Sequence, residues 1–244
     1  MARKERLYIN GIPLIVSFPD RARGWVLFLH GAGGSKERTA RIAAPFHERG
    51  LITVHPDAPL HGERADGRWR FDPKDPRNYL EGVVRAISIQ VDELPDLTTG
   101  LAHIPELTGL PLLAAGASMG GYVWHELISR ELLRPRAAAI LISSGFPLDA
   151  PHDFLEGQNE LLDAYRNPPV TRAMAYPPTP LLHLHGDRDP VVPLARMQET
   201  VTALRRAYKK RDGRLAYTVF EGVGHELPEI MLQQAAAWLE FWSS

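Results

Sequence analysis

Cysteine is absent from the 244-residue chain, and lysine is scarce, with five lysines among 28 basic residues. The absence of cysteine excludes disulfides, a thiol nucleophile and cysteine-based metal sites. The formal net charge is −1, which gives no general attraction to nucleic acid or to anionic membranes. No apolar run is long enough to span a bilayer, and the N-terminal residues lack the apolar core of a secretory signal. We therefore expect a cytoplasmic protein with neither a nucleic acid nor a membrane as partner.

A Gly-Ala-Ser-Met-Gly sequence at residues 116–120 follows an apolar run and precedes a helical pattern. This spacing is typical of a nucleophile elbow, a sharp strand-to-helix turn that exposes a serine hydroxyl. Glycine is needed on both sides because a Cβ there would strike neighbouring backbone. The sequence predicts Ser118 as the nucleophile.

Three further segments follow predicted strands. Residues 25–29 are followed by His30-Gly31-Ala32-Gly33-Gly34. Residues 180–184 are followed by His-Gly-Asp-Arg-Asp at 185–189, and residues 215–220 are followed by Glu-Gly-Val-Gly-His at 221–225. Together with the elbow they resemble the α/β-hydrolase superfamily over nearly the whole chain, with Ser, Asp and His in that order. Within it, the chain resembles compact serine esterases and the dienelactone hydrolase or prolyl-oligopeptidase-like group.

The resemblance implies an α/β-hydrolase fold: a mostly parallel eight-stranded sheet with helices on both faces. Asn10-Gly11 between two apolar segments predicts an antiparallel N-terminal hairpin, since both residues tolerate positive φ. Periodicity predicts helices over residues 39–49 and 77–94. We expect one domain over residues 1–244, with only a short cap-like insertion at about 145–178.

The resemblance also assigns roles in catalysis. Ser118 needs a base to take its proton, and His225 is that base. Asp189 orients the imidazole, because the family's His-Gly-x-x-Asp pattern places the acid there. Asp187 is the main competitor and Asp149 a more distant one, since sequence alone does not show which carboxylate faces His225.

An oxyanion formed during acyl transfer needs two backbone N–H donors. The first is expected from Met119, directly after the nucleophile and at a helix N-terminus. The second is expected from the loop after His30, either Ala32 or Gly33. Gly33 is also a candidate for contact with the substrate, and a tight turn alone would explain Gly33-Gly34 as well.

Residues 56–76 form a long polar loop that we expect to lie over or beside the site. Glu63 and Arg64 are predicted to pair and fix this loop. In a second hypothesis Arg64, Arg68 or Arg70 binds a substrate carboxylate, with Trp69 and Phe71 lining a pocket.

These features predict a serine hydrolase that cleaves carboxylic esters of a small molecule without metal or cofactor. A short cap favours a shallow pocket and short acyl chains, because long chains need a deep apolar surface. A peptidase, thioesterase or lactone hydrolase would use the same machinery, and a non-catalytic binding protein is a more distant alternative. The sequence leaves the oligomeric state open.

Overall fold

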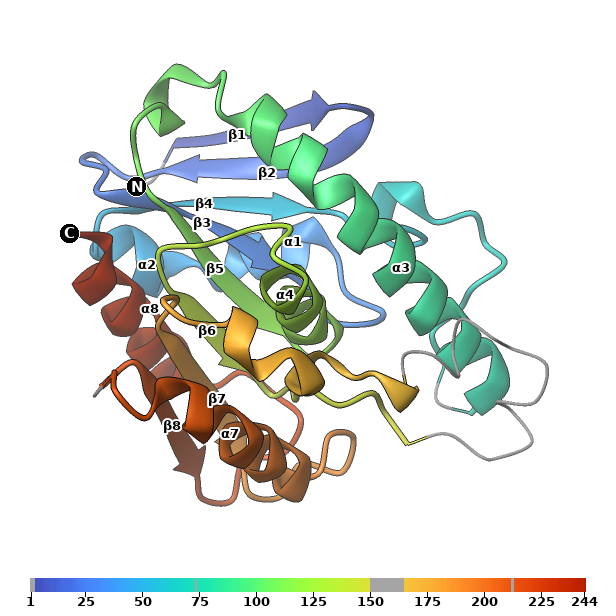
Figure 1. Cartoon of the computed structure of the whole chain (residues 1–244). Coiled ribbons are helices and arrows are strands. Elements are labelled where there is room, and N and C mark those ends of the chain that lie inside the picture. The colour runs from blue at the N-terminus through green and yellow to red at the C-terminus, as the bar shows by residue number, and fades with distance from the viewer. Residues whose placement is uncertain (1–2, 73, 150–164, 212) are drawn as a thin grey trace.

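A computed structural model describes residues 3–72, 74–149, 165–211 and 213–244 (Figure 1). Eight strands form one sheet in the order β1-β2-β4-β3-β5-β6-β7-β8. The strands are β1 (Arg3–Ile9), β2 (Ile12–Phe18), β3 (Gly24–Leu29), β4 (Leu51–Pro56), β5 (Leu112–Ala117), β6 (Ala138–Leu141), β7 (Leu181–Gly186) and β8 (Leu215–Phe220).

The N-terminal hairpin is the antiparallel part of the sheet. Asn10 and Gly11 have φ values of 51° and 78°, as a tight turn between β1 and β2 requires. Strand β2 is also antiparallel to β4, whereas the pairings from β4 through β8 are parallel. The predicted mixed sheet with its antiparallel start is therefore confirmed.

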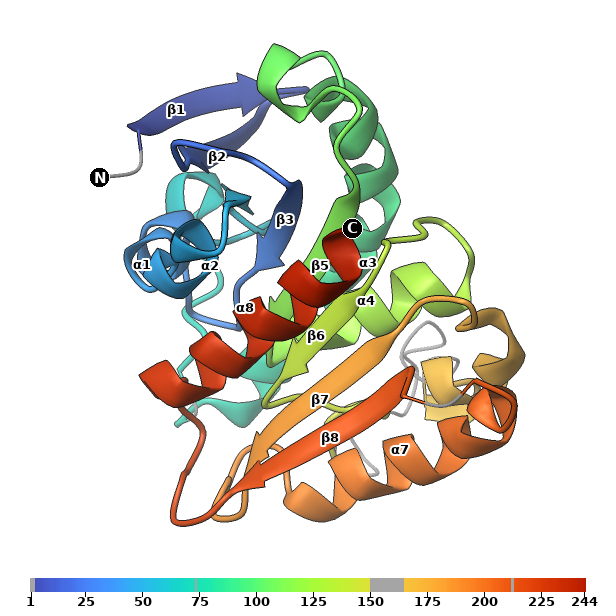
Figure 2. The same ribbon diagram turned by 90° about the vertical axis from the view of Figure 1, so that its left-hand side faces the viewer.

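Helices cover both faces of the sheet. Figure 2 shows α8 across one face, beside α1 and α2, while α3, α4 and α7 lie on the opposite face. The helices are α1 (Lys36–Arg41), α2 (Ala44–Glu48), α3 (Pro76–Leu101), α4 (Met119–Ser129), α7 (Leu194–Tyr208) and α8 (Glu229–Ser243), with short 3₁₀ helices η1 (Gly62–Arg64), η2 (Pro105–Leu107) and η3 (Pro169–Ala175).

Strand β3 shows why the central strands are apolar throughout. Trp25, Leu27 and Leu29 pack into the core under α3 and α4, whereas Val26 and Phe28 pack into the core under α2 and α8. Alternate side chains of a strand point to opposite faces, so a sheet covered on both faces needs apolar residues at every position.

Two predicted helices differ from those observed. Residues 39–49 form two short helices, α1 and α2, with Pro45 in the first turn of α2. Proline has no N–H to continue a preceding helix, which explains the break. Helix α3 continues past Pro95 to Leu101, and its N-terminus is capped by Asp75, whose side chain accepts a hydrogen bond from the Asn78 amide.

The cap-like insertion expected at residues 145–178 lies partly outside the described residues, which omit 150–164. Its described part contains η3, which contacts α4 and α7. Within the described ranges, none of the helices combines the length and apolar character that a membrane span requires.

Several histidines are buried inside the fold. His183 on β7 is fully buried and stacks on His125 of α4, with ring centroids 5.2 Å apart. Burial lowers the pKa of His183 and of His55 to about 3. These side chains are therefore neutral in the folded protein over a pH range in which they bind protons in the unfolded chain.

We predict that the free energy of unfolding falls as pH decreases from about 6.5 towards 3, because the unfolded chain then binds protons that buried histidines exclude. His183→Leu should reduce this slope by about 1.4 kcal/mol per pH unit. Urea unfolding at a series of pH values measures it, with exposed His103→Leu as the control. An unchanged slope in His183→Leu would contradict the prediction.

Candidate active site

Ser118 occupies a sharp turn between β5 and α4. Its φ of 52° and ψ of −118° are unfavourable for a residue with a side chain. A Cβ on Gly116 would lie 2.4 Å from the Gly120 carbonyl oxygen, and a Cβ on Gly120 would lie 2.4 Å from that of Leu29. Only glycine permits these backbone approaches, so the predicted strand-to-helix turn is present.

His225 and Asp189 meet Ser118 from two other strand ends. The imidazole Nε2 lies 3.0 Å from Ser118 Oγ, and Nδ1 lies 2.7 Å from Asp189 Oδ2. Burial would raise the pKa of Asp189, but hydrogen bonds from His225 and from the Val191 and Val192 amides outweigh it and lower the pKa. A carboxylate ionised in this way can hold the imidazole with Nδ1 protonated and Nε2 facing the serine.

The two alternative acids lie elsewhere. Asp187 Oδ1 accepts a hydrogen bond of 2.7 Å from the Gly222 amide, and so joins the turns after β7 and β8. Asp149 forms an ion pair of 2.5 Å with Arg196 on α7. Of the three carboxylates weighed from the sequence, the one at hydrogen-bonding distance from His225 is Asp189.

Two backbone amides are available beside Ser118. Ala32 and Met119 both line the same cavity as the serine. Neither amide donates a hydrogen bond to another described residue. Met119 is the first residue of α4, where N–H groups lack intrahelical acceptors. Gly33 does not line this cavity; its φ of 68° fits the tight-turn interpretation.

The loop that carries Ala32 is fixed from behind. His30 Nε2 accepts a hydrogen bond of 3.0 Å from the Ala58 amide, and Nδ1 lies 2.8 Å from the Gly31 carbonyl oxygen. A Cβ on Gly31 would lie 3.1 Å from the Ser118 Cβ, so the loop backbone passes directly beside the nucleophile. Its position depends on contacts that reach β4 and the segment after it.

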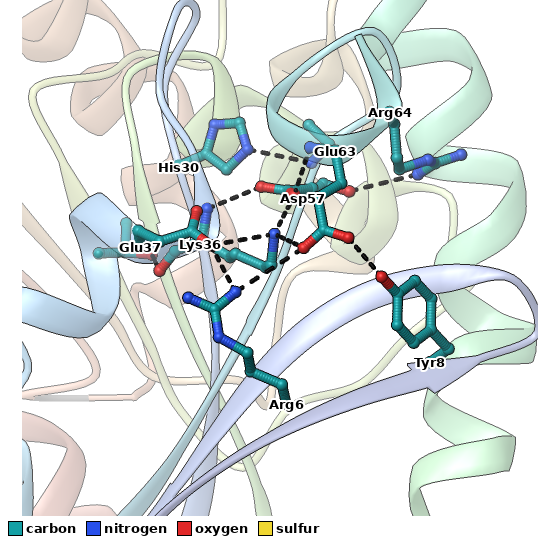
Figure 3. A network of polar contacts seen from close by, with 10 residues as sticks. Arg6, Tyr8, His30, Lys36, Glu37, Asp57, Glu63 and Arg64 are labelled. Atoms are coloured by element: carbon teal, nitrogen blue, oxygen red, sulfur yellow. Dashed lines mark hydrogen bonds and ion pairs between the residues drawn. The ribbon is translucent and has the colours of Figure 1, made fainter.

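A buried ion pair joins this loop to the segment after β4 (Figure 3). Lys36 Nζ lies 2.6 Å from Asp57 Oδ2, and the Lys36 amide donates to Asp57 Oδ1 at 2.8 Å. Both side chains are almost fully buried. Asp57 Oδ2 also accepts from the Glu63 amide. Asp57 therefore ties together the start of α1 and the start of η1.

Two further carboxylates surround Lys36. Glu63 and Glu37 lie 2.7 and 3.2 Å from its ammonium, and Arg6 and Tyr8 of β1 contact them in turn (Figure 3). Burial would lower the pKa of Lys36, but hydrogen bonds to Asp57, Glu63 and Glu37 outweigh it and raise the pKa. The lysine is therefore a fixed cation.

The polar loop at 56–76 differs from the prediction. Arg64 pairs with Glu93 of α3 at 2.5 and 2.8 Å, and Glu63 pairs with Lys36 instead of Arg64. Trp69 is buried against Gly82 of α3, where an added Cβ would lie 3.2 Å from the indole. Neither Arg64 nor Trp69 is among the described residues that line the cavity, and the contacts seen for both are structural.

The cavity at Ser118 has a volume of about 450 Å³. Its apolar wall is one face of α3. Its polar wall comes from α4 and the chain around η3, and includes Glu126, Arg130 and Arg172. The sequence motifs do not single out these three residues, although Glu126 and Arg130 follow Ser118 by eight and twelve residues, on and just after a predicted helix.

Within the described part of the chain, no group of three or more histidine, aspartate or glutamate side chains is arranged to hold a metal ion. His30 and His61 lie edge to face, with ring centroids 5.1 Å apart, and Asp57 binds Lys36. His61 Nδ1 lies 2.7 Å from the Pro59 carbonyl oxygen, and its ring stacks on Phe71 at 3.8 Å.

Fold and geometry agree with comparisons to known families. A family model described as "Alpha/beta hydrolase family" matches residues 26–168, more than half of the chain, and one described as "Phospholipase/Carboxylesterase" matches residues 167–243. The chain therefore belongs to the α/β-hydrolase family, as predicted, and is a hydrolase by family membership.

Individual relatives match almost the whole length of this chain. TT1662 from Thermus thermophilus is 39% identical, with 100% of this chain and 99% of that chain covered and a TM-score of 0.90. A Bacillus subtilis protein named "Putative esterase YitV" is 25% identical, with 98% and 99% covered. An acylaminoacyl peptidase from Pyrococcus horikoshii shares the fold at 16% identity, with a TM-score of 0.69 over 99% of this chain and 41% of that chain.

We predict that Lys36→Met lowers the free energy of unfolding by about 3 to 5 kcal/mol, because Asp57 is left as a buried carboxylate without its cation. Chemical denaturation measures this loss. The matched control is Arg77→Met, which removes an exposed pair with Glu81 and should cost less than about 1 kcal/mol. Equal losses in the two variants would show that the Lys36–Asp57 pair is energetically unimportant.

Proposed function

We propose that the protein hydrolyses carboxylic esters through an acyl-enzyme formed on Ser118. The observation that carries this proposal is the contact of Ser118 Oγ with His225 Nε2, and of His225 Nδ1 with Asp189, at one end of a cavity. A hydrogen-bonded serine, histidine and carboxylate is the arrangement that activates a hydroxyl for attack on a carbonyl. The name of the Bacillus subtilis relative as an esterase adds support.

In the proposed reaction, His225 Nε2 takes the proton of Ser118 Oγ as the oxygen attacks the ester carbonyl carbon. The Ala32 and Met119 amides then bind the oxyanion of the tetrahedral intermediate. The intermediate collapses, the ester C–O bond breaks, and His225 donates its proton to the leaving alcohol. Water, deprotonated by His225, attacks the acyl carbon. The bond from that carbon to Ser118 Oγ then breaks, His225 returns the proton to Oγ, and the acid is released.

Asp189 supports both proton transfers. Its carboxylate accepts a hydrogen bond from protonated Nδ1, which keeps Nε2 free as the base towards Ser118. It also stabilises the imidazolium formed in each step. Thioesters, lactones and peptides undergo the same acyl transfer, so a thioesterase, lactone hydrolase or peptidase remains the alternative within this mechanism.

We further propose that neutral substrates carry short acyl chains, from acetyl to about hexanoyl. The apolar face of α3 lines the cavity that holds Ser118, and Glu126, about two turns further along α4, lines it together with Arg172. A long neutral chain would bring methylenes against charged groups and remove water from them, which is unfavourable. The charged wall therefore limits the length of a neutral acyl chain.

We predict that Ser118→Ala lowers kcat for p-nitrophenyl butyrate at least about 10³-fold, because the acyl-enzyme cannot form. A fluorophosphonate probe should label the wild-type protein and leave Ser118→Ala unlabelled. Ser88→Ala, which changes another serine of the cavity wall, is the matched control and should still be labelled. Substantial hydrolysis or labelling by folded Ser118→Ala would contradict the mechanism.

We predict different effects of two isosteric substitutions. Asp189→Asn should lower kcat by about 10⁴-fold, because an amide favours the wrong tautomer of His225. Asp187→Asn should change kcat by less than about tenfold, because Asp187 contacts the Gly222 backbone and not the imidazole. Steady-state kinetics compares them, and the reverse ranking would assign the acid to Asp187.

A further inference from the structure

The cavity at Ser118 lies between two helix faces of opposite character. Helix α3 lines it with an apolar face that includes Leu80, Val83 and Ile87. Tyr122 and Glu126 of α4 and Arg130, the residue after the helix, also line the cavity, and they follow Ser118 at intervals of four residues. Side chains four residues apart on a helix are neighbours, so this row begins beside the nucleophile and ends with charged groups.

The length of α4 sets the distance between those ends. Its 11 residues span about 17 Å at a rise of about 1.5 Å per residue. Ser118 precedes the first residue of α4, Arg130 follows the last, and both line the cavity. The cavity is therefore elongated, and an acyl chain bonded to Ser118 Oγ would extend along α3 towards Arg130.

Arg172 is held in place at the charged end. Its guanidinium donates to Glu126 Oε2 at 2.8 Å, to Ser129 Oγ at 3.0 and 3.1 Å, and to the Asn167 carbonyl oxygen at 3.0 Å. Burial raises the pKa of Glu126, and the nearby charges of Arg172 and Arg130 oppose that shift. Most donors of Arg172 are thus occupied by the protein itself.

The Arg130 guanidinium is not occupied in this way. It is exposed at the end of the cavity and forms neither an ion pair nor a side-chain hydrogen bond with the described residues. Among the described residues, Arg130 and Arg172 are two cations beside one carboxylate, that of Glu126. Among the described residues at this end there is therefore one positive charge in excess, on a guanidinium that has five N–H donors.

We propose that this end of the cavity binds a carboxylate, and that the preferred substrates are half-esters of α,ω-dicarboxylic acids. This rests on the hydrolase function proposed above, and it names the substrate class. The ester carbonyl lies at Ser118, the methylenes pack against the apolar face of α3, and the ω-carboxylate accepts hydrogen bonds from Arg130. The sequence predicts a carboxylate-binding arginine in the 56–76 loop, whereas this proposal assigns that role to Arg130, at the C-terminal end of α4.

A simpler role for Arg130 is electrostatic. As the residue after the last turn of α4, it complements the partial negative charge of the helix C-terminus. That role affects the stability of the helix and gives no preference between ligands with and without a carboxylate. A comparison of charged and neutral ligands of equal length separates the two roles.

The test measures kcat/KM for mono-p-nitrophenyl suberate and for p-nitrophenyl octanoate, which differ only in the group at the far end of the chain. We expect the wild-type ratio of charged to neutral substrate to exceed one, and to fall about tenfold or more in Arg130→Gln. Arg130→Lys should retain part of the preference. The corresponding succinate and butyrate esters should show no such effect, because their chains are too short.

Arg134→Gln is the matched control. Arg134 lies four residues further along the chain, is exposed, pairs with Glu131 and does not line this cavity. It should keep the wild-type ratio. An Arg130→Gln ratio equal to that of the wild type, or an equal fall in Arg134→Gln, would overturn the proposed carboxylate site while leaving ester hydrolysis by Ser118 intact.

Binding without turnover tests the carboxylate site independently of catalysis. Isothermal titration calorimetry with monomethyl suberate in the Ser118→Ala background should give a Kd about tenfold lower than in Ser118→Ala/Arg130→Gln. Methyl octanoate should show no difference between these variants. Equal Kd values for monomethyl suberate would overturn the inference even if no ester were hydrolysed, whereas unequal values with no hydrolysis would overturn the proposed function alone.

Discussion

The close approach of three backbone segments around Ser118 is the constraint on which the candidate site depends. Gly120 of α4 sits against the end of β3, Gly116 sits against Gly120, and Gly31 sits against Ser118 itself. A side chain at Gly116 or Gly120 would separate the elbow from its neighbours. The strained Ser118 backbone persists because these segments hold it from several sides. The available amides of Ala32 and Met119 come together for the same reason.

Charge is arranged differently on the two sides of this turn. Behind the loop that carries Ala32, Lys36 forms ion pairs with Asp57, Glu63 and Glu37, so carboxylates of the protein neutralise its charge. In front of the turn, Arg130 is left without a described partner at the end of the cavity. The first arrangement stabilises a position, and the second leaves a cation for a ligand. Burial explains the contrast, since a buried charge needs fixed partners and an exposed one does not.

Local signals predicted much of the fold. Asn10-Gly11 indicated the hairpin, and continuous apolar runs indicated strands covered on both faces, as in β3. Where local signals predicted the wrong helix boundaries, a proline was the cause. Pro45 starts a new helix inside a segment with helical periodicity, and Pro95 is accommodated within α3. Hydrophobic periodicity does not report whether a backbone hydrogen bond can be omitted at such a position.

The order and spacing of the sequence motifs determined which residues of this protein could meet at one edge of the sheet. This was possible because parallel strands end at that edge in a known order. Only the tertiary structure decided the pairings of long charged side chains. Arg64 pairs with Glu93, Lys36 with Asp57, and Arg172 with Glu126, across 29, 21 and 46 residues of chain. Such contacts depend on how helices pack and have no sequence period. For the same reason, the cavity between α3 and α4, with Arg130 at its end, was visible only in three dimensions.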